Sequence, residues 1–259
     1  MSQAHGTPVP IRFDTGGAGA PTLVLLHGLG VNAAAWGALM PLVEARWPGR
    51  WIAPDLRGHG GSGHGTPYGY AVHAADVAGL LDQDEEVVVL GHSMGGVVAM
   101  ALATGWFGVS VSAALAFGVK IAWTQEEVAK LKQIAEAPAR LFGTRDEAVE
   151  RYLKVSGMSG LIAPDSASAL SGVTGTDGGY RLAADPAINA VAGPEVAEFY
   201  GAARAPVRLA AGTGDPMVSL EDMQALDPDA VSVEGAGHNL HLEKPDALWA
   251  LLEDAAGLT

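Results

Sequence analysis

A serine flanked by glycines carries the clearest chemical signal in this sequence. The segment Gly91-His92-Ser93-Met94-Gly95 follows an apolar, β-branched run at 87–90 and precedes a run rich in Ala and Val at 97–103. Strand, tight turn and helix in this order are typical of the nucleophile elbow, whose strained turn holds a serine hydroxyl at the end of a strand. Glycines are needed beside that turn because a side chain there would clash with the adjacent strand and helix. The pattern predicts that Ser93 is a nucleophile.

A serine hydroxyl needs a base within hydrogen-bonding reach, and a carboxylate usually orients that base. His238 lies in a glycine-rich loop before the last predicted helix, and Asp215 follows a strand predicted at 207–210. The chain order serine, aspartate, histidine is the one found in a large class of hydrolases. We therefore predict His238 as the base and Asp215 as its partner. Nearby residues of the same types are rival candidates: Asp222, Asp227, Asp229 and His241.

Acyl transfer also requires donors for the oxyanion that develops on the attacked carbonyl. The residue after the nucleophile, Met94, is expected to offer one backbone N–H. The loop His27-Gly28-Leu29-Gly30 follows an early strand, and its glycines let the backbone approach a substrate closely. Leu29 is therefore the second expected donor.

These residues must be positioned by a sheet, because each follows a predicted strand. Apolar runs and alternation predict strands at residues 9–13, 22–26, 51–54, 87–90, 109–117, 207–210 and 230–233. Helical spacing predicts a helix capped by Asn32, one at 70–81 and one at 245–252. Strands that alternate with helices indicate a parallel sheet covered by helices on both faces.

The alternation stops at residues 120–204, where the sequence predicts helices and no strand. Thr124 with Glu127, and Thr144 with Glu147, have the spacing of capping boxes. Pro164 and Pro194 are expected to punctuate two later helices, and 174–179 is a polar, glycine-rich loop. We expect a core domain at 1–119 and 206–259, and an all-helical cap at 120–205 over the carboxyl edge of the sheet, where ligands bind.

Composition narrows the class of protein. The chain has 259 residues, 49% of them hydrophobic, a formal net charge of −14 and no cysteine. These values are typical of a globular chain, speak against nucleic-acid or anionic-membrane partners, and exclude disulfides and thiolate chemistry. Met1 to Pro10 lacks the regions of a signal peptide, and no apolar run reaches the roughly 20 residues of a membrane helix. A cytoplasmic location is expected, with no metal and no cofactor, while the choice between monomer and homodimer stays open.

Several motifs together resemble the α/β-hydrolase superfamily. They are His27-Gly28-x-Gly30, Pro54-Asp55-x-Arg57-Gly58-His59-Gly60-x-Ser62, Gly91-His92-Ser93-Met94-Gly95-Gly96, Gly214-Asp215 and Gly237-His238. The resemblance covers residues 9–119 and 206–257, and it is greatest to the carboxylesterase and C–C-bond-hydrolase branches that carry a helical cap. It implies an α/β fold with a mostly parallel, twisted sheet of eight strands, flanked by helices, with the cap inserted after the sixth strand.

The resemblance also sharpens the chemistry. Only one strand is recognisable before Thr22, so the first hairpin of the family is expected to be shortened. Residues 55–62 are implied to be architectural. Dehalogenases and epoxide hydrolases of this fold place an aspartate at the elbow, whereas this chain has Ser93, and dehalogenases tend to follow the nucleophile with tryptophan, whereas this chain has Met94.

Substrate choice is expected to depend on the cap and on the surroundings of the elbow. Apolar residues that are candidates to line an acyl or alcohol pocket are Trp36, Met94, Trp123, Leu141, Phe142, Met158, Leu161 and Val218. Ordinary core packing is the alternative for each of them. Three cap arginines, Arg140, Arg145 and Arg151, are candidates to bind a carboxylate, and a solvated face explains them equally well.

The combined pattern predicts a serine hydrolase that cleaves small or medium, mostly apolar carboxylic esters through an acyl-enzyme. The same groups can cleave a C–C bond beside a ketone, hydrolyse a lactone or amide, or form peracids. A ligand receptor or signalling protein with slow turnover is the alternative from another class. The expected partner is a small-molecule ester.

Overall fold

The structure is a computed structural model that describes residues 9–191 and 196–258. The first eight residues of the N-terminal segment and the predicted helix break at Pro194 lie outside the described residues. Within these ranges, no helix combines the length and apolar character that crossing a bilayer requires.

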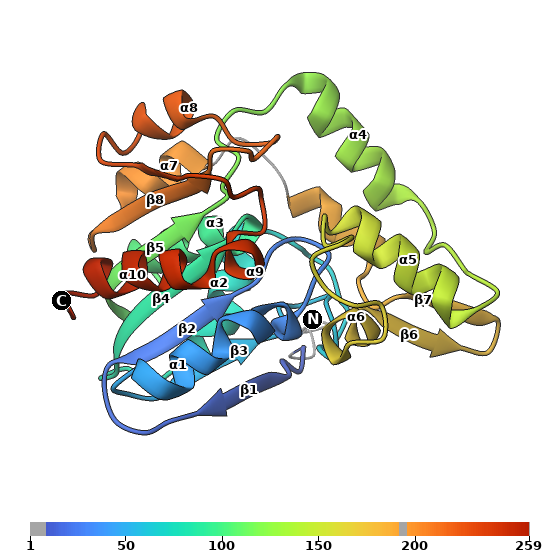
Figure 1. The fold of residues 1–259 in the computed structure, drawn as a ribbon, viewed down its shortest axis with the longest axis horizontal. Helices are drawn as coiled ribbons and strands as arrows, with labels where there is room; N and C mark the ends of the chain where they lie inside the picture. The colour runs from blue at the N-terminus through green and yellow to red at the C-terminus, as the bar shows by residue number, and fades with distance from the viewer. Residues whose placement is uncertain (1–8, 192–195, 259) are drawn as a thin grey trace, which may run out of the picture.

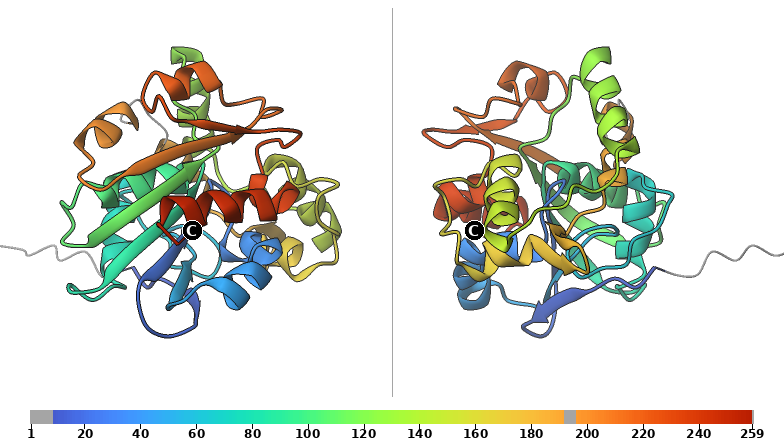
Figure 2. Two further views of the ribbon diagram at one scale, coloured as in Figure 1. Left: turned by 60° about the vertical axis from the view of Figure 1, so that its left-hand side comes forward. Right: turned by 90° about the vertical axis from the view of Figure 1, so that its right-hand side faces the viewer.

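A seven-stranded sheet forms the centre of the described chain, in the order β1-β3-β2-β4-β5-β8-β9. Only β1 runs antiparallel, against β3. The strands are β1 (Phe13–Gly16), β2 (Thr22–Leu26), β3 (Trp51–Pro54), β4 (Glu86–His92), β5 (Ser110–Phe117), β8 (Val207–Gly212) and β9 (Val231–Val233). The mostly parallel sheet predicted from the sequence is confirmed (Figures 1 and 2).

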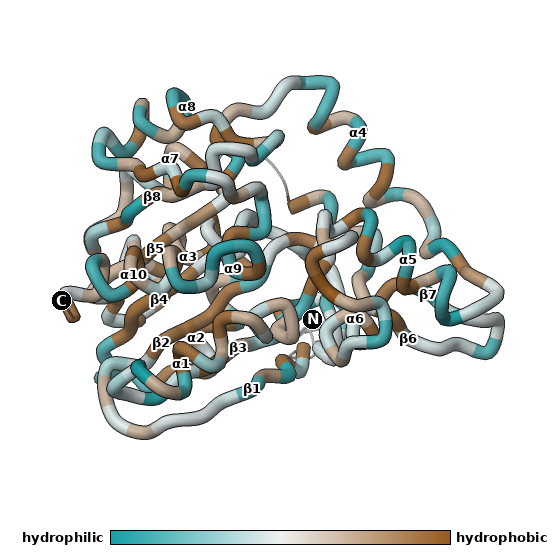
Figure 3. Tube along the Cα trace, in the orientation of Figure 1, coloured by the Kyte–Doolittle hydropathy of each residue, from teal (hydrophilic) through white to brown (hydrophobic). Residues whose placement is uncertain are grey.

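The central strands are apolar on both faces because helices cover both (Figure 3). Along β2, Leu23 and Leu25 pack into one hydrophobic cluster and Val24 and Leu26 into the other, as the two-residue period of a strand requires. One cluster includes helices α2 (Tyr70–Ala78) and α3 (Met94–Ala103). The other includes the 3₁₀ helix η1 (Ala33–Ala38), α1 (Met40–Arg46), α9 (Leu240–Glu243) and α10 (Pro245–Ala255).

The first predicted strand is displaced. β1 begins at Phe13 instead of Val9, because the backbone before it bonds to the loop at 55–63. The Arg12 N–H donates to Ser62 Oγ (2.9 Å), and the Pro10 carbonyl accepts from the Gly63 N–H (2.8 Å). The loop implied to be architectural is thus tied to the edge of the sheet.

The segment between β5 and β8 is the cap segment, residues 120–205. It begins with α4 (Gln125–Glu136) and α5 (Arg145–Val155), and both predicted capping boxes are formed. It continues through α6 (Ala167–Ser171), β6 (Val173–Thr176), β7 (Gly179–Leu182), η2 (Pro186–Val191) and α7 (Val196–Ala202). The parallel strands of the sheet point toward this segment, whereas β1 runs the other way (Figure 1).

The expectation of an all-helical insertion after a sixth strand is wrong in two respects. The insertion follows the fifth described strand, because a single described strand, β1, precedes β2. It also contains an antiparallel hairpin, β6–β7, where the sequence predicts a loop. The two hairpin strands are short and mostly half-exposed, so they lack the alternation that reveals a strand.

The cap segment has its own small core. Val149, Tyr152 and Leu153 of α5 pack with Phe142 and Met158. The same cluster includes Val31 and, within η1, Ala35. Helix α4 differs, because none of its residues is buried, and it packs against η2. The chain then returns through β8, α8 (Leu220–Gln224) and β9 to the C-terminal helices.

Candidate functional site

Ser93 occupies a strained turn between β4 and α3. Its φ of 51° and ψ of −115° make it the one described non-glycine residue with a positive φ. The flanking glycines are required by space: a Cβ at Gly91 would overlap the Gly95 carbonyl, and one at Gly95 would overlap the Leu26 carbonyl. The Ser93 N–H donates to the Phe117 carbonyl of β5 (2.8 Å), which fixes the turn to the sheet. This is the predicted elbow geometry.

Asp215 and His238 meet at the neighbouring strand ends. His238 Nδ1 lies 2.8 Å from Asp215 Oδ2, and the Asp215 carboxylate is fully buried. Asp215 Oδ1 accepts from the Met217 N–H (2.8 Å), which holds the carboxylate toward the imidazole. Bonding at Nδ1 leaves Nε2 as the basic nitrogen. The structure thus brings together the two residues that the sequence pairs.

The rival residues are engaged elsewhere. Asp227 accepts from the Leu209 N–H (2.9 Å), and Asp229 pairs with Arg208 (2.9 Å). The Asp222 N–H lies in the capping turn of α8. The His241 ring is buried among aromatic side chains, tilted against Trp36 at 5.1 Å between centroids.

The loop that carries His238 is held on both sides. The Glu243 carboxylate accepts from the Gly237 N–H (2.7 Å) and from the Asn239 N–H (3.1 Å). The His92 ring donates from Nε2 to the His238 carbonyl (3.1 Å). Three backbone groups around one imidazole are therefore satisfied by side chains, which preorganises the base.

Asn239 connects the same loop to the cap segment. Its side-chain N–H groups donate to the carbonyls of Ser156 and Gly157, both at 3.1 Å, just beyond the end of α5. Asn239 itself is buried. The loop of His238 and the C-terminal end of α5 are thus joined directly.

Leu29 and Met94 both line the cavity beside Ser93. No described residue accepts a hydrogen bond from the Leu29 N–H, and the Met94 N–H lies in the first turn of α3, where backbone donors lack helical partners. The His27 ring positions the Leu29 loop, because Nδ1 donates to the Gly28 carbonyl (2.8 Å) while Nε2 accepts from the Leu56 N–H (2.9 Å). Burial lowers the pKa of His27 to about 4, so the neutral tautomer that these bonds need persists near neutral pH.

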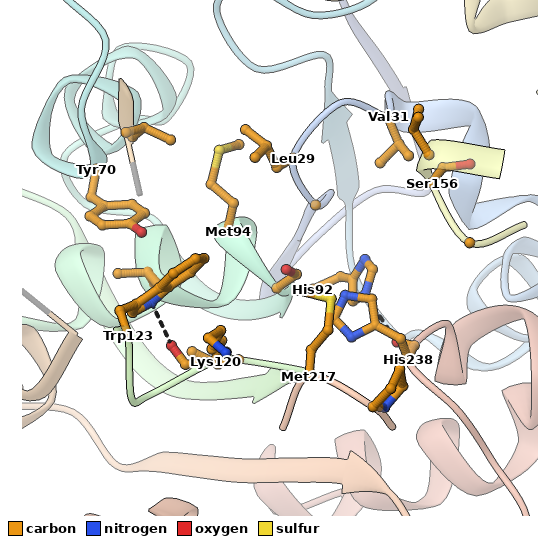
Figure 4. A pocket seen from close by; sticks show the side chains of 18 of the residues that line it. Leu29, Val31, Tyr70, His92, Met94, Lys120, Trp123, Ser156, Met217 and His238 are labelled. Atoms are coloured by element: carbon orange, nitrogen blue, oxygen red, sulfur yellow. Dashed lines mark hydrogen bonds between the residues drawn. The ribbon is translucent and has the colours of Figure 1, made fainter. Parts of the chain in front are cut away.

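A cavity of about 310 Å³ contains these groups, and we call it the reaction cavity. Ser93 and His238 line it together with Leu29 and Met94. Figure 4 shows Tyr70, Trp123, Met217 and Ser156 around the same space. The described structure contains no hydrogen bond from Ser93 Oγ to His238, so their contact belongs to the proposal below.

The predicted pocket residues separate into three groups. Trp123 lines the reaction cavity, and Phe142 lines a second chamber beside it. The expectation is wrong for Trp36 and Met158, which are buried in hydrophobic clusters, and for Leu141 and Leu161, whose side chains face solvent. Val218 packs against the core without lining either space.

Several lining residues escaped the sequence analysis. Val119 and Lys120 follow the end of β5, while Pro216 and Met217 follow Asp215 after β8. Their positions just beyond strand ends were a usable signal, because ligands of parallel sheets bind at that edge. Lys154, Val155 and Ser156 had no comparable signal, since only the packing of the cap segment brings them to the cavity.

The remaining buried histidines are uncharged near neutral pH. Burial lowers the pKa of His59, His73 and His241 to about 3, and burial with repulsion from His241 and His238 lowers that of His92 well below its usual range. All four are neutral near pH 7. Among residues 9–191 and 196–258, no group of three or more His, Asp or Glu side chains is arranged to hold a metal ion.

Fold and elbow together define the class of protein. Residues 23–251 match the model of the alpha/beta hydrolase family, and the chain belongs to that family. A magnesium-chelatase 30 kDa subunit of Rhodobacter capsulatus is 30% identical over 93% of this chain and 89% of that protein.

Other similarities are more local or more distant. A pimeloyl-[acyl-carrier protein] methyl ester esterase of Edwardsiella ictaluri is 42% identical over 34% of this chain, and the match spans about a third of that protein, 32%. The crystal structure of an E-2-(acetamidomethylene)succinate hydrolase covers 95% of this chain and 96% of its own, with a TM-score of 0.76 and 24% identity. That likeness shows the fold.

Proposed function

We propose that this chain is a serine hydrolase that cleaves carboxylic esters through an acyl-enzyme. His238 Nε2 takes the proton of the Ser93 hydroxyl while Oγ attacks the ester carbonyl. The N–H groups of Leu29 and Met94 stabilise the oxyanion, and Asp215 stabilises the imidazolium. The C–O bond breaks, and the alcohol leaves with the proton from His238.

Water completes the cycle. It enters the reaction cavity, gives a proton to His238 and attacks the acyl carbonyl. The acid leaves when the Ser93–carbonyl bond breaks, and Ser93 Oγ regains its proton. In this proposal, residues 1–119 and 206–259 form the catalytic core domain, and residues 120–205 form the cap that shapes the cavity.

The observation that carries the proposal is the buried 2.8 Å contact between Asp215 and His238 beside a serine with a φ of 51°. This backbone conformation costs free energy, and strain of this kind is concentrated at functional sites, where it holds a side chain such as the Ser93 hydroxyl toward a ligand. The name of the esterase from E. ictaluri supports ester cleavage within the family.

The test is release of p-nitrophenol from acetate, butyrate and octanoate esters by wild type and Ser93→Ala. We expect sustained turnover that falls by several orders of magnitude in Ser93→Ala. Full activity in Ser93→Ala would contradict the assignment of the nucleophile. The chain-length trend measures how much acyl chain the cavity accepts.

A ligand-binding protein with slow turnover is the second candidate. One observation favours it: the relative similar over most of the chain is named as a subunit of magnesium chelatase, not as an esterase. The same assay separates the two candidates. A single acylation burst followed by almost no turnover supports the binding protein, and continuous turnover supports the enzyme.

A further inference from the structure

A second chamber of about 530 Å³ adjoins the reaction cavity. The two spaces share Leu29, Val155 and Ser156 as lining residues, so these three mark the boundary between them. The second chamber lies between α4, α5 and η2 of the cap segment and the core loop at Leu29 and Gly30. Its lining is mostly apolar, which suits the hydrocarbon part of a ligand.

Two exposed arginines, Arg140 and Arg151, are also among the residues that line this chamber. Neither forms an ion pair with a carboxylate of the described chain, although the protein has 29 acidic residues and only 15 Lys and Arg. Arg140 lies over the Phe142 ring, 4.9 Å from its centroid. In a chain with about twice as many acidic as basic residues, two exposed arginines that line one chamber and have no described carboxylate partner point to an anionic ligand.

Helix α5 carries positively charged residues that line both spaces. Arg151, Lys154 and Val155 are three and four residues apart, so they lie on one face of the helix. Arg151 lines the second chamber, Lys154 lines the reaction cavity, and Val155 lines both. Arg145, at the start of the same helix, lines neither space.

One described carboxylate, that of Asp185, lines the second chamber. It already accepts from the Tyr68 hydroxyl (2.7 Å) and from the Ala187 N–H (3.0 Å), and His64 lies 3.9 Å away. Burial and the hydrogen bond to Asp185 raise the pKa of Tyr68 to about 12, so Tyr68 remains a donor. Asp185 thus has hydrogen-bond partners of its own and forms no ion pair with Arg140 or Arg151.

We propose that the second chamber binds the anionic end of the substrate, a carboxylate or a phosphate, while the ester carbonyl at the other end lies beside Ser93. The substrate class is then an amphipathic ester with an apolar middle and a negatively charged end. This inference rests on the proposed esterase function and narrows its substrates.

The test compares monomethyl suberate, which ends in a carboxylate, with the neutral dimethyl suberate. The measured quantity is the ratio of the two kcat/KM values in wild type, Arg140→Ala, Arg151→Ala and the double variant. We expect the ratio to fall up to about 5-fold in the double variant, as the loss of an exposed ion pair implies. The matched control, Arg145→Ala, removes the same charge from the same helix and keeps the wild-type ratio.

Two results would overturn the inference. One is an unchanged ratio in the double variant. The other is an equal decrease in Arg145→Ala, which would reduce the effect to the general charge of the cap segment. A series of monomethyl esters from succinate to sebacate adds a geometric test: two spaces at a fixed separation predict an optimal length, and a flat length dependence contradicts them.

Binding measurements separate this inference from the proposed function. Calorimetry with monomethyl suberate and Ser93→Ala requires no turnover, so weaker binding when Arg140→Ala and Arg151→Ala are added supports the chamber even if no ester is hydrolysed. Octyl phosphate and octanoate as competitors identify the anion. If one of the two competes more strongly with monomethyl suberate and this competition is lost in the double arginine variant, the inference is supported. Competition that persists in the double variant contradicts it.

Discussion

The core and the cap segment use positive charge differently. Five of the six core cations, Arg12, Arg46, Arg50, Arg57 and Arg208, form ion pairs with carboxylates, and Lys244 forms none with a described one. The cap segment holds nine cations, of which only Lys120 pairs with a described carboxylate, that of Glu127 (2.9 Å). Most cations of the core are therefore held by carboxylates, whereas most of those in the cap segment have no described carboxylate partner.

The histidines, in contrast to the lysines and arginines, are absent from the cap segment. None of the eight lies at 120–205, and five in the core are buried: His27, His59, His73, His92 and His241. In the proposed function, the core fixes the geometry of the reacting groups with buried histidines, which makes it sensitive to acid, and the cap segment contacts the substrate. Each prediction below tests this division.

Acid should unfold the core, and this is the largest expected effect. The folded pKa values of His27, His59, His73 and His241, at about 3 to 4, lie below the unfolded value of 6.5. Below pH 6.5 the unfolded chain binds protons that the folded chain excludes, so stability present above pH 6.5 is lost as the pH falls toward 4. Each histidine then contributes a loss of about 2 kcal/mol at pH 5.

Urea unfolding at a series of pH values measures this loss. His73→Leu is the informative variant, because neither ring nitrogen of His73 has a hydrogen-bond partner among the described residues. It should shift the acid transition to lower pH by removing one proton-binding site. An acid transition that stays in place would show that His73 does not contribute.

Asp215→Asn should lower kcat by about 10³- to 10⁴-fold while the protein stays folded, because an amide cannot stabilise the imidazolium. Asp227→Asn is the matched control in the same region, since Asp227 bonds to the backbone of β8 rather than to His238. Its effect should appear in stability rather than in kcat. Steady-state kinetics and thermal melting distinguish the two, and an equal loss of kcat in both variants would contradict the assignment.

Replacing a leucine with alanine should destabilise the protein much more in the core than on the surface of the cap segment. Leu90→Ala removes a fully buried side chain from β4 and should lower the free energy of unfolding by about 2–5 kcal/mol. Leu141 in the cap segment is 54% exposed, so Leu141→Ala should change the free energy of unfolding by no more than about 0.5 kcal/mol. Denaturant titration checks both values, and a comparable loss in Leu141→Ala would mean that the cap segment is built like the core.

The smallest effect concerns the two capping boxes. Thr144→Ala should lower global stability by about 1 kcal/mol, because α5 packs into the cap cluster. Thr124→Ala should instead loosen α4 locally, since none of its residues is buried. Hydrogen exchange resolves the two outcomes, and global destabilisation by Thr124→Ala would show that α4 is more firmly integrated than its burial indicates.

The parts of this fold that the sequence predicted have local causes. Buried runs such as 22–26 predicted strands, and glycines around Ser93 predicted the elbow, because each pattern is set by neighbouring residues. The sequence offered Trp36 as a candidate pocket residue but could not say what lies against it, and its buried ring contacts those of Phe117 and His241 in the core. The second chamber could not be predicted, because residues far apart in the chain form it.

Asn239 gives the division between core and cap a thermodynamic consequence. Because its side chain bonds to Ser156 and Gly157, any displacement of the end of α5 breaks the bonds that also order the loop of His238. The position of the cap segment and the order of the His238 loop are therefore coupled, so an interaction that stabilises one also stabilises the other. A ligand bound only to the cap segment would then raise the fraction of molecules with an ordered histidine loop, without touching it.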